Sequence, residues 1–421
     1  MRTRRAPHGW ALVLTLFCTS PALAQTTTPT PTPPGQPAPP IPGTTTTVET
    51  TTIASTLSQI VGPVGTSHVG DALSLAAQLG IATTPYGASS GGFLIKLDPS
   101  TGLQVRTAST FGPVFAERAL TSGEGKLSLG ASFQPSTYDR LNDLAVDNNL
   151  QVRSATGATA AASRSGTTSL SLKSTTTIIF ARMGLSDNFD VGANIPLVAV
   201  KLSGTASLKS GVGDILFAQG AANSSGLGDV QGIAKYRFKS FGTGIPDPGG
   251  IAAMVTMTLP TGDKSQFRGL DITRTMITLI ASSGQARVRP HGNVGFGYWS
   301  KGLSVVSDTP GSPTVTARHE FQYAGGLEFE AVPKLTLLVD LLGGGVLGGG
   351  KVGFTSVTDS VGLTSQGLAA LSEGTRRIDL APGLKANLKG KMLLSLSALI
   401  ALHDTGMHAR VTPVAGIDLT F

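Results

Sequence analysis

The last twelve residues, 410–421, alternate between apolar and polar side chains with a period of two. The apolar positions are Val411, Pro413, Ala415, Ile417, Leu419 and Phe421. The alternate positions carry Thr412, Val414, Gly416, Asp418 and Thr420. Because successive residues of a strand point to opposite faces, this pattern predicts a half-apolar β-strand. Its length of about ten residues is enough to cross a bilayer when the strand is tilted, but an ordinary last strand of a soluble sheet fits equally well.

The same alternation recurs along the chain from residue 126 onward. It predicts about twelve strands, at 126–135, 168–184, 188–203, 228–239, 250–260, 271–283, 286–300, 318–331, 334–348, 374–388, 391–402 and 409–421. A count of fourteen is the alternative. A closed sheet of this kind requires the last strand to pair with the first, at 126–135 in the twelve-stranded count.

The connections between the predicted strands fall into two classes. Short ones follow even-numbered strands, at 186–188, 283–285, 332–334 and 389–391. Long ones follow odd-numbered strands, at 136–167, 204–227, 301–317 and 349–373. Outer-membrane barrels have short periplasmic turns and longer outer loops. We therefore predict an all-β fold, a transmembrane antiparallel β-barrel over residues 111–421 with both ends in the periplasm.

Within the strands, apolar residues occupy one face and charged residues the other. A charge at the lipid midplane costs about 2–4 kcal/mol, so the charged face is expected to point into the lumen. The lumen-lining candidates are Lys235, Arg237, Arg287, Arg289, His291, Asn293, Arg318, Glu320, Glu328, Asp340, Arg377, Asp379 and Lys385. Tyr236, Phe238, Tyr298, Phe321, Tyr323 and Phe421 lie near strand ends, where an aromatic girdle belongs.

The lumen candidates carry both signs, and arginines and carboxylates of adjacent strands are placed to form ion pairs. Arg287, Arg289 and Arg318 are expected to meet Glu320, Glu328 and Asp340. Two interpretations stay open: these side chains line a narrow polar conduit, which we favour, or they are ion pairs that fill a small barrel. Twelve strands lie between filled eight-stranded barrels and open porins.

The residues before the barrel divide into three predicted segments. Residues 1–24 have three early arginines, an apolar core and a small-x-small site, so we predict a signal peptide cleaved after Ala24. Residues 25–52 are rich in Thr and Pro and predict a disordered linker. Residues 53–110 predict short helices over 53–81 and a small hairpin. The helices either plug the barrel, which we favour, or lie in the periplasm as a helical hairpin.

Composition narrows the class of protein further. Only 14% of the residues are charged, yet no stretch after residue 25 approaches the roughly 20 apolar residues of a membrane helix. Cys18, the only cysteine, lies in the predicted signal peptide, so the mature chain has no disulfide. The formal net charge of +7 includes the three arginines of that peptide, and the mild excess that remains does not favour a nucleic-acid partner.

Several short motifs resemble one family of outer-membrane barrels. They are 116–119, 123–126, 133–134, 228–238, 259–263 and 289–298. Over residues 110–421 the chain resembles the transporter family named for the MetA pathway of phenol degradation, which is itself distantly similar to long-chain fatty-acid transporters. The resemblance implies an outer-membrane channel for aromatic or other hydrophobic compounds. Gly416, Leu419 and Phe421 resemble the C-terminal signal that the barrel assembly machinery recognises.

The sequence predicts no enzyme. His291, His319, His403 and His408 are available, but no Gly-x-Ser-x-Gly motif accompanies them and no metal-ligand spacing stands out. We predict no catalytic residue, cofactor or metal. The expected partners are outer-membrane lipid, lipopolysaccharide, the assembly machinery and a small hydrophobic solute. The predicted function is passive uptake of small hydrophobic or aromatic compounds, and the alternative is a structural or cell-wall-associated barrel without transport.

Overall fold

The computed structural model describes a large part of the chain, all of it within the compact unit at residues 43–421. The described residues are 46–48, 52–62, 67–87, 95–97, 102, 104–106, 108, 110–147, 150–155, 163–210, 213–243, 247–284, 287–305, 315–358, 364–389 and 391–421. The predicted signal peptide and most of the predicted linker lie outside these residues. At the end of the linker, β1 (Thr46–Val48) is described as a short strand.

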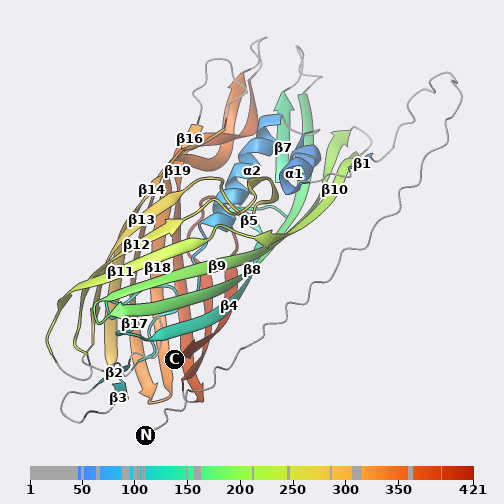
Figure 1. Cartoon of the computed structure of the whole chain (residues 1–421). Coiled ribbons are helices and arrows are strands. Elements are labelled where there is room, and N and C mark those ends of the chain that lie inside the picture. The colour runs from blue at the N-terminus through green and yellow to red at the C-terminus, as the bar shows by residue number, and fades with distance from the viewer. Residues whose placement is uncertain are drawn as a thin grey trace, which may run out of the picture. The chain divides into compact units, whose positions relative to one another are not determined.

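Twelve antiparallel strands in the described part of the chain close into a barrel (Figure 1). In chain order they are β4 (Leu127–Tyr138), β8 (Ser163–Ser186), β9 (Phe189–Ser210), β11 (Gln231–Ser240), β12 (Gly249–Thr258), β13 (Arg274–Ser283), β14 (Val288–Trp299), β17 (Glu320–Val332), β18 (Leu335–Thr358), β19 (Thr364–Lys389), β20 (Met392–Ala401) and β22 (Val411–Thr420). The barrel closes where β22 pairs with β4, with Ile417 opposite Ala131. The fold class, the count of twelve and the position of the seam are confirmed.

The connections sort as the sequence predicted. Tight turns join β8 to β9, β17 to β18 and β19 to β20 at the end of the barrel where Phe421 lies, which we call the turn end. Long connections join β4 to β8, β12 to β13, and β14 to β17 at the opposite end, the loop end. Both the start of β4 and the end of β22 therefore lie at the turn end.

Three predicted loops at the loop end are largely strand, so those boundaries were wrong. β9 continues to Ser210, and β10 (Gly213–Leu227) returns along it before the chain enters β11. In the same way, β8 already begins at Ser163. β18 continues to Thr358, and β19 begins at Thr364. In β8 and β9 the outward side chains of the extensions become polar, as at Ser171, Ser203 and Thr205, which hides the strand period. Backbone pairing continues because its hydrogen bonds do not depend on side-chain type.

The remaining strands are not among the twelve that close the barrel. β1 lies parallel to β10, and β7 (Leu150–Ala155) pairs with the start of β8. β2 (Ile95–Leu97) pairs antiparallel with β3 (Gln104–Arg106). At the loop end, β5 (Arg140–Leu141) pairs with β6 (Leu144–Ala145) and β21 (Met407–His408), β15 (Leu303–Val305) pairs with β16 (Val315–Ala317), and η2 (Lys264–Gln266) is a single 3₁₀ turn.

The predicted helical segment forms α1 (Ile53–Val61) and α2 (Ser67–Ala82). Thr52 caps α1, because its side-chain oxygen accepts a hydrogen bond from the Ser55 N–H at 3.1 Å. α1 ends at Val61, and Gly62 is its C-cap residue. No helix in the described ranges is both long and apolar enough to cross a membrane.

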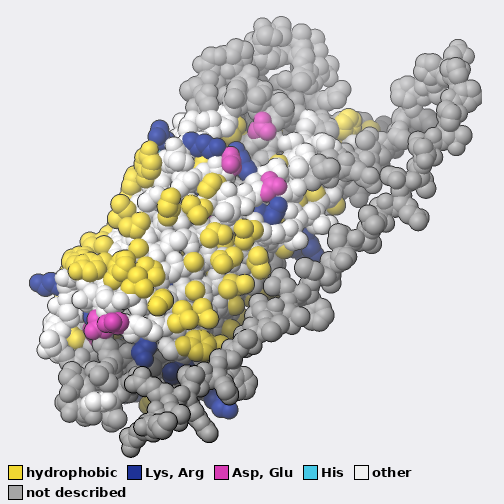
Figure 2. All heavy atoms as spheres, viewed as in Figure 1, with side chains coloured by type: hydrophobic (Ala, Val, Ile, Leu, Met, Phe, Trp, Pro, Cys, Tyr) yellow, Lys and Arg dark blue, Asp and Glu magenta, His cyan; other side chains and the backbone are white. Residues whose placement is uncertain are grey.

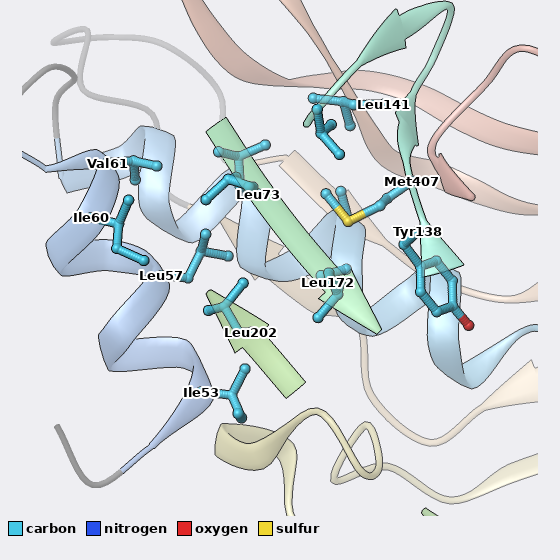
Figure 3. Packing of buried hydrophobic residues seen from close by; sticks show 14 of the residues in the cluster. Ile53, Leu57, Ile60, Val61, Leu73, Tyr138, Leu141, Leu172, Leu202 and Met407 are labelled. Atoms are coloured by element: carbon cyan, nitrogen blue, oxygen red, sulfur yellow. The ribbon is translucent and has the colours of Figure 1, made fainter. Parts of the chain in front are cut away.

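Both helices pack inside the loop-end half of the barrel and form its largest apolar core. Leu57 and Leu73 are at most 2% exposed and belong to one buried cluster with Leu172 of β8 and Leu202 of β9. Figure 3 shows these four side chains converging between the helices and the two strands. Burying an aliphatic side chain of this size contributes about 1.5–3 kcal/mol, so the apolar inward face of the extensions is explained by helix docking. That the helices plug the barrel stays a prediction.

Candidate functional site

The turn-end half of the lumen is crossed by residues 110–122, which we call the strap. The strap has no regular secondary structure, so its backbone N–H groups need partners from elsewhere. The barrel wall supplies them. Phe111 N donates to Thr336 Oγ1 at 3.1 Å, Gly112 N to Glu328 Oε2 at 3.2 Å, Glu117 N to Asn293 Oδ1 at 2.8 Å, Ala119 N to Ser282 Oγ at 2.9 Å and Ser122 N to Asp190 Oδ2 at 2.9 Å.

Two buried lysines of the barrel wall bind oxygen atoms of the strap. Lys385 Nζ donates to the carbonyl oxygen of Pro113 at 2.6 Å. Lys235 Nζ lies 3.4 Å from Glu117 Oε2 and 4.0 Å from Asp190 Oδ2. Wall carboxylates thus accept from the strap while wall ammonium groups donate to it. The predicted lumen charges therefore hold a chain segment in place, an arrangement closer to the filled barrel than to the conduit that we favoured.

A buried histidine lies between two carboxylates in the same half of the lumen. His291 Nε2 is 2.8 Å from Asp340 Oδ1, and His291 Nδ1 is 3.5 Å from Glu328 Oε1. The guanidinium of Arg118 in the strap lies 3.8 Å from Glu328 Oε2. Gly326 of β17 lies between His291 and Asp340 in the strand register. A Cβ at this position would lie 2.2 Å from Asp340 Oδ1, so only glycine leaves room for the pair.

The other lumen candidates divide by position. Arg289 is buried opposite Glu328 in the β14–β17 register, and Arg237 binds Asp247 at 2.7 Å near the turn end. Glu320 faces inward but pairs with Arg274 of β13 at 3.6 Å, a partner that the sequence did not indicate.

The last two candidates lie at the barrel ends instead of within the lumen. Arg287 is exposed at the turn end, where its guanidinium lies 5.8 Å from the Phe329 ring centroid, and Arg318 is exposed at the loop end.

A cavity of about 60 Å³ separates α2 from the barrel wall at the loop end. Its lining is half polar and includes Arg377, Asp379, His403, His408 and Tyr138. Arg377 Nε lies 3.0 Å from Asp379 Oδ2, and its guanidinium also donates to the carbonyl oxygen of Thr83 just after α2. This arrangement ties the end of the helix to β19 and leaves an amphipathic space beside it.

Two histidines of the loop at 402–410 border this cavity, and their ring centroids are 4.5 Å apart. Burial lowers the pKa of His403, and the nearby Arg377 lowers it further. Burial and the neighbouring His403 ring lower the pKa of His408. Both rings are therefore neutral at pH 7, and neither contributes positive charge to the cavity. In the described ranges no group of three His, Cys, Asp or Glu side chains is placed to hold a metal ion.

The outward face of the barrel is apolar across its middle. Figure 2 shows hydrophobic side chains over the middle of the wall and Lys and Arg side chains nearer its two margins. On β14, Val294, Phe296 and Tyr298 are each more than 50% exposed, while the alternate residues are buried. A closed antiparallel barrel with an apolar outer belt satisfies every backbone group within lipid. The fold is that of a transmembrane β-barrel of the outer-membrane type.

Solved barrels include structures with a weak likeness to this one. An outer-membrane channel from Pseudomonas putida F1 aligns over 72% of this chain and 98% of its own, with a TM-score of 0.47 and 12% identity. The Ralstonia pickettii toluene transporter TbuX covers 71% and 90%, with a TM-score of 0.34 and 14% identity. A Pseudomonas aeruginosa FadL homologue covers 82% and 97%, with a TM-score of 0.29 and 11% identity. Similarity this low identifies neither a solute nor a mechanism.

No protein-family model matches the sequence, and no curated protein matches it. The resemblance to the phenol-pathway transporter family therefore stays a prediction. So does recognition of the C-terminal signal. Leu419 and Phe421 point outward and are 39% and 58% exposed. Gly416 lies on the inward face beside Ser395, where a Cβ would come within 2.6 Å of the Ser395 hydroxyl.

The strap itself was missed as part of the site. Glu117 and Arg118 were noted in the sequence only within a motif of the family resemblance, although a charged pair in an apolar stretch was a usable signal. In the structure both side chains are buried in the lumen, and the pairs they form cross from the strap to the wall. An acid and a base side by side in an otherwise apolar segment need buried partners, which only the closed barrel supplies.

Proposed function

We propose that this protein is an outer-membrane channel for passive uptake of small hydrophobic or aromatic compounds, and that α1, α2 and the strap gate it. One observation carries the proposal. The two helices and the strap pack against inward side chains of the barrel, and the twelve strands pair into a closed sheet without them. Both the helices and the strap are joined to the wall by apolar contacts, hydrogen bonds and ion pairs, so their displacement opens a path without breaking the barrel.

The loop-end cavity supports the solute class. Its lining combines apolar groups, such as Leu79 and Leu399, with Arg377 and the Tyr138 hydroxyl. Such a mixture matches a solute with an apolar body and one polar end, and at about 60 Å³ the cavity admits one only when α2 moves away. The cavity lies beside the helix that blocks the outer half of the lumen, which is where an entering solute would first compete with the gate.

A disulfide lock tests the gate directly. Ala119 N donates to Ser282 Oγ at 2.9 Å, so Ala119→Cys with Ser282→Cys places two thiols between the strap and β13. The purified double variant is reconstituted in liposomes, and entry of a radiolabelled aromatic or fatty acid is measured under oxidising and reducing conditions. We expect uptake like that of the wild type when reduced, and uptake at the level of bare liposomes when oxidised. The two single-cysteine variants control for the substitutions.

Two outcomes would contradict the proposal. If the oxidised lock transports as fast as the reduced protein, the strap is not the gate. If neither the wild type nor the reduced variant admits any solute, the barrel is not a channel, and the structural alternative takes its place.

A further inference from the structure

Two lysines face each other on the outside of the barrel. Lys173 of β8 and Lys201 of β9 are direct cross-strand partners, and both are exposed. Their neighbours along each strand, including Leu172 and Val200, are buried and point inward. The two ammonium groups therefore share one patch of outer wall. Like charges directly opposite each other in a sheet are destabilising unless a counter-charge is present.

The protein itself does not supply that counter-charge within the described residues. Neither lysine takes part in an ion pair there. The carboxylate of Asp139, on the connection that follows β4, is bound by Arg410 at 2.6 Å. The side chains next to the lysines in register are Thr137 of β4 and Asn223 of β10, both exposed and both hydrogen-bond donors.

The pair lies at the loop-end edge of the apolar belt. Toward the turn end, the outward residues of β9 are Ala199, Leu197 and Ile195, and toward the loop end they are Ser203 and Thr205. On β8, Lys173 is separated from exposed Leu185 by about 40 Å of strand, which is about 28 Å of height at a 45° tilt. The apolar band of an outer-membrane barrel is about 25 Å tall, so both lysines reach the level of the lipid headgroups.

The opposite wall has a different boundary. There the loop-end margin of the belt carries aromatic side chains on β14 and β17, with Tyr298 stacked on His319 at 5.0 Å between ring centroids. Aromatic rings are general anchors at a membrane interface, whereas a pair of facing ammonium groups is a point of concentrated positive charge. On this side of the barrel, β8 and β9 expose no aromatic side chain at the level of the lysines, and the exposed Phe217 of β10 lies farther toward the loop end. The β8–β9 patch therefore carries its positive charge without an aromatic anchor beside it.

We propose that Lys173 and Lys201, flanked by Thr137 and Asn223, bind a phosphate group of lipopolysaccharide in the outer leaflet. The inference rests on the outer-membrane location that belongs to the proposed function, but it does not depend on transport. The loop end is the outer end of the barrel, and the patch is on the face toward lipid. Ammonium groups bind phosphate through charge-assisted hydrogen bonds, and the two flanking polar side chains are placed to supplement them.

The test uses the full-length protein purified in a zwitterionic detergent. Binding of lipopolysaccharide is titrated for the wild type, for K173Q/K201Q and for K239Q/K334Q. The last variant removes two exposed lysines at the turn end and serves as the matched control. We expect K173Q/K201Q to bind at least about tenfold more weakly than the wild type, because it loses two charge-assisted hydrogen bonds, while the control binds as the wild type does.

Two further measurements separate the alternatives. Enzymatically dephosphorylated lipopolysaccharide is expected to bind the wild type and K173Q/K201Q equally weakly, and inorganic phosphate at millimolar concentration is expected not to compete. Without lipid, K173Q/K201Q is expected to unfold at the same temperature as the wild type or higher, since the repulsion is gone. Equal lipopolysaccharide affinity of the two proteins, competition by inorganic phosphate, or a lower unfolding temperature of the lipid-free variant would each overturn the assignment.

Discussion

The two halves of the barrel interior are filled by neighbouring parts of the same N-terminal segment in different ways. At the loop end, α1 and α2 pack leucines, isoleucines and valines against apolar inward faces of the strand extensions. At the turn end, the strap is held by hydrogen bonds and ion pairs with Asp190, Asn293, Glu328 and Lys385. Apolar packing is non-directional and tolerates small shifts, whereas a buried polar network is stable only when each member keeps its partner.

The difference indicates how such a plug can be released. Sliding an apolar helix along an apolar wall exposes area gradually. Moving the strap leaves several buried charges without partners at once, so the turn-end half is expected to open as a unit. The comparison therefore predicts unequal sensitivity of the two halves to substitution.

The largest effect is expected from Asp340→Ala. The Asp340 carboxylate is completely buried 2.8 Å from His291 Nε2, so its removal leaves a buried polar ring with a single remaining carboxylate. Breaking a buried pair from one side destabilises a protein by about 3–5 kcal/mol. Equilibrium unfolding in urea, with the barrel in lipid bilayers, measures the loss. Lys334→Ala, at an exposed position just before the same strand, is the control. If Asp340→Ala lowers the free energy of unfolding by less than about 1 kcal/mol, the polar turn-end half is no more sensitive to substitution than the rest of the barrel.

A smaller and more local effect is expected from Leu73→Ala in α2. Leu73 is 0% exposed within the apolar cluster, and truncation of a buried leucine costs about 2–4 kcal/mol depending on how well the cavity collapses. Because the barrel hydrogen bonds do not involve this side chain, we expect faster hydrogen exchange in α2 with unchanged protection in β14 and β17. Asp71→Ala, on the exposed side of the same helix, should leave both unchanged. Equal loss of protection in helix and barrel would mean that the plug and wall unfold together.

The smallest effect is expected from pH at the loop of residues 402–410. The pKa values of His403 and His408 are lowered from 6.5 by burial, so the undocked loop takes up protons more readily than the docked one. Docking is then strongest above pH 6.5 and weakens as the pH falls toward the lowered values. Arg377 disfavours protonation, while the carboxylates of Asp379, Asp404 and Asp139 favour it, so the change should be modest.

Hydrogen exchange of the loop at pH 7.5 and 5.5, corrected for intrinsic rates, measures this effect. H403Q/H408Q should abolish the difference. A pH dependence that survives in the double variant would assign it to the carboxylates instead.

Much of the wall could be predicted because strand alternation is a local property. The inward positions of Arg289 and His291, and the outward positions of Phe296 and Tyr298, follow from the period of two alone. The prediction from the period of two failed in the strand extensions at the loop end. Toward the loop end, outward serines and threonines replace apolar residues on β8 and β9. The extensions of these strands and of β18 and β19 were predicted as loops.

The partners of the lumen charges could not be predicted, because they depend on which strands face each other across the interior. Glu328 is bound by His291 of the neighbouring strand, as adjacency suggests, but also by Arg118, about two hundred residues earlier in the chain. Lys385 binds a backbone carbonyl of the strap, which carries no sequence signal.

The amino-acid sequence by itself determined a twelve-stranded barrel, the face of each strand that meets lipid, the end at which the chain closes and the presence of two helices before it. These properties follow from residue periodicity and from connection lengths, which are local. Only the tertiary structure decided that the helices and the strap fill the lumen and that Lys173 faces Lys201 on its outer wall. Closing the barrel sets which inward groups surround the strap, and strand register sets which outward groups become neighbours.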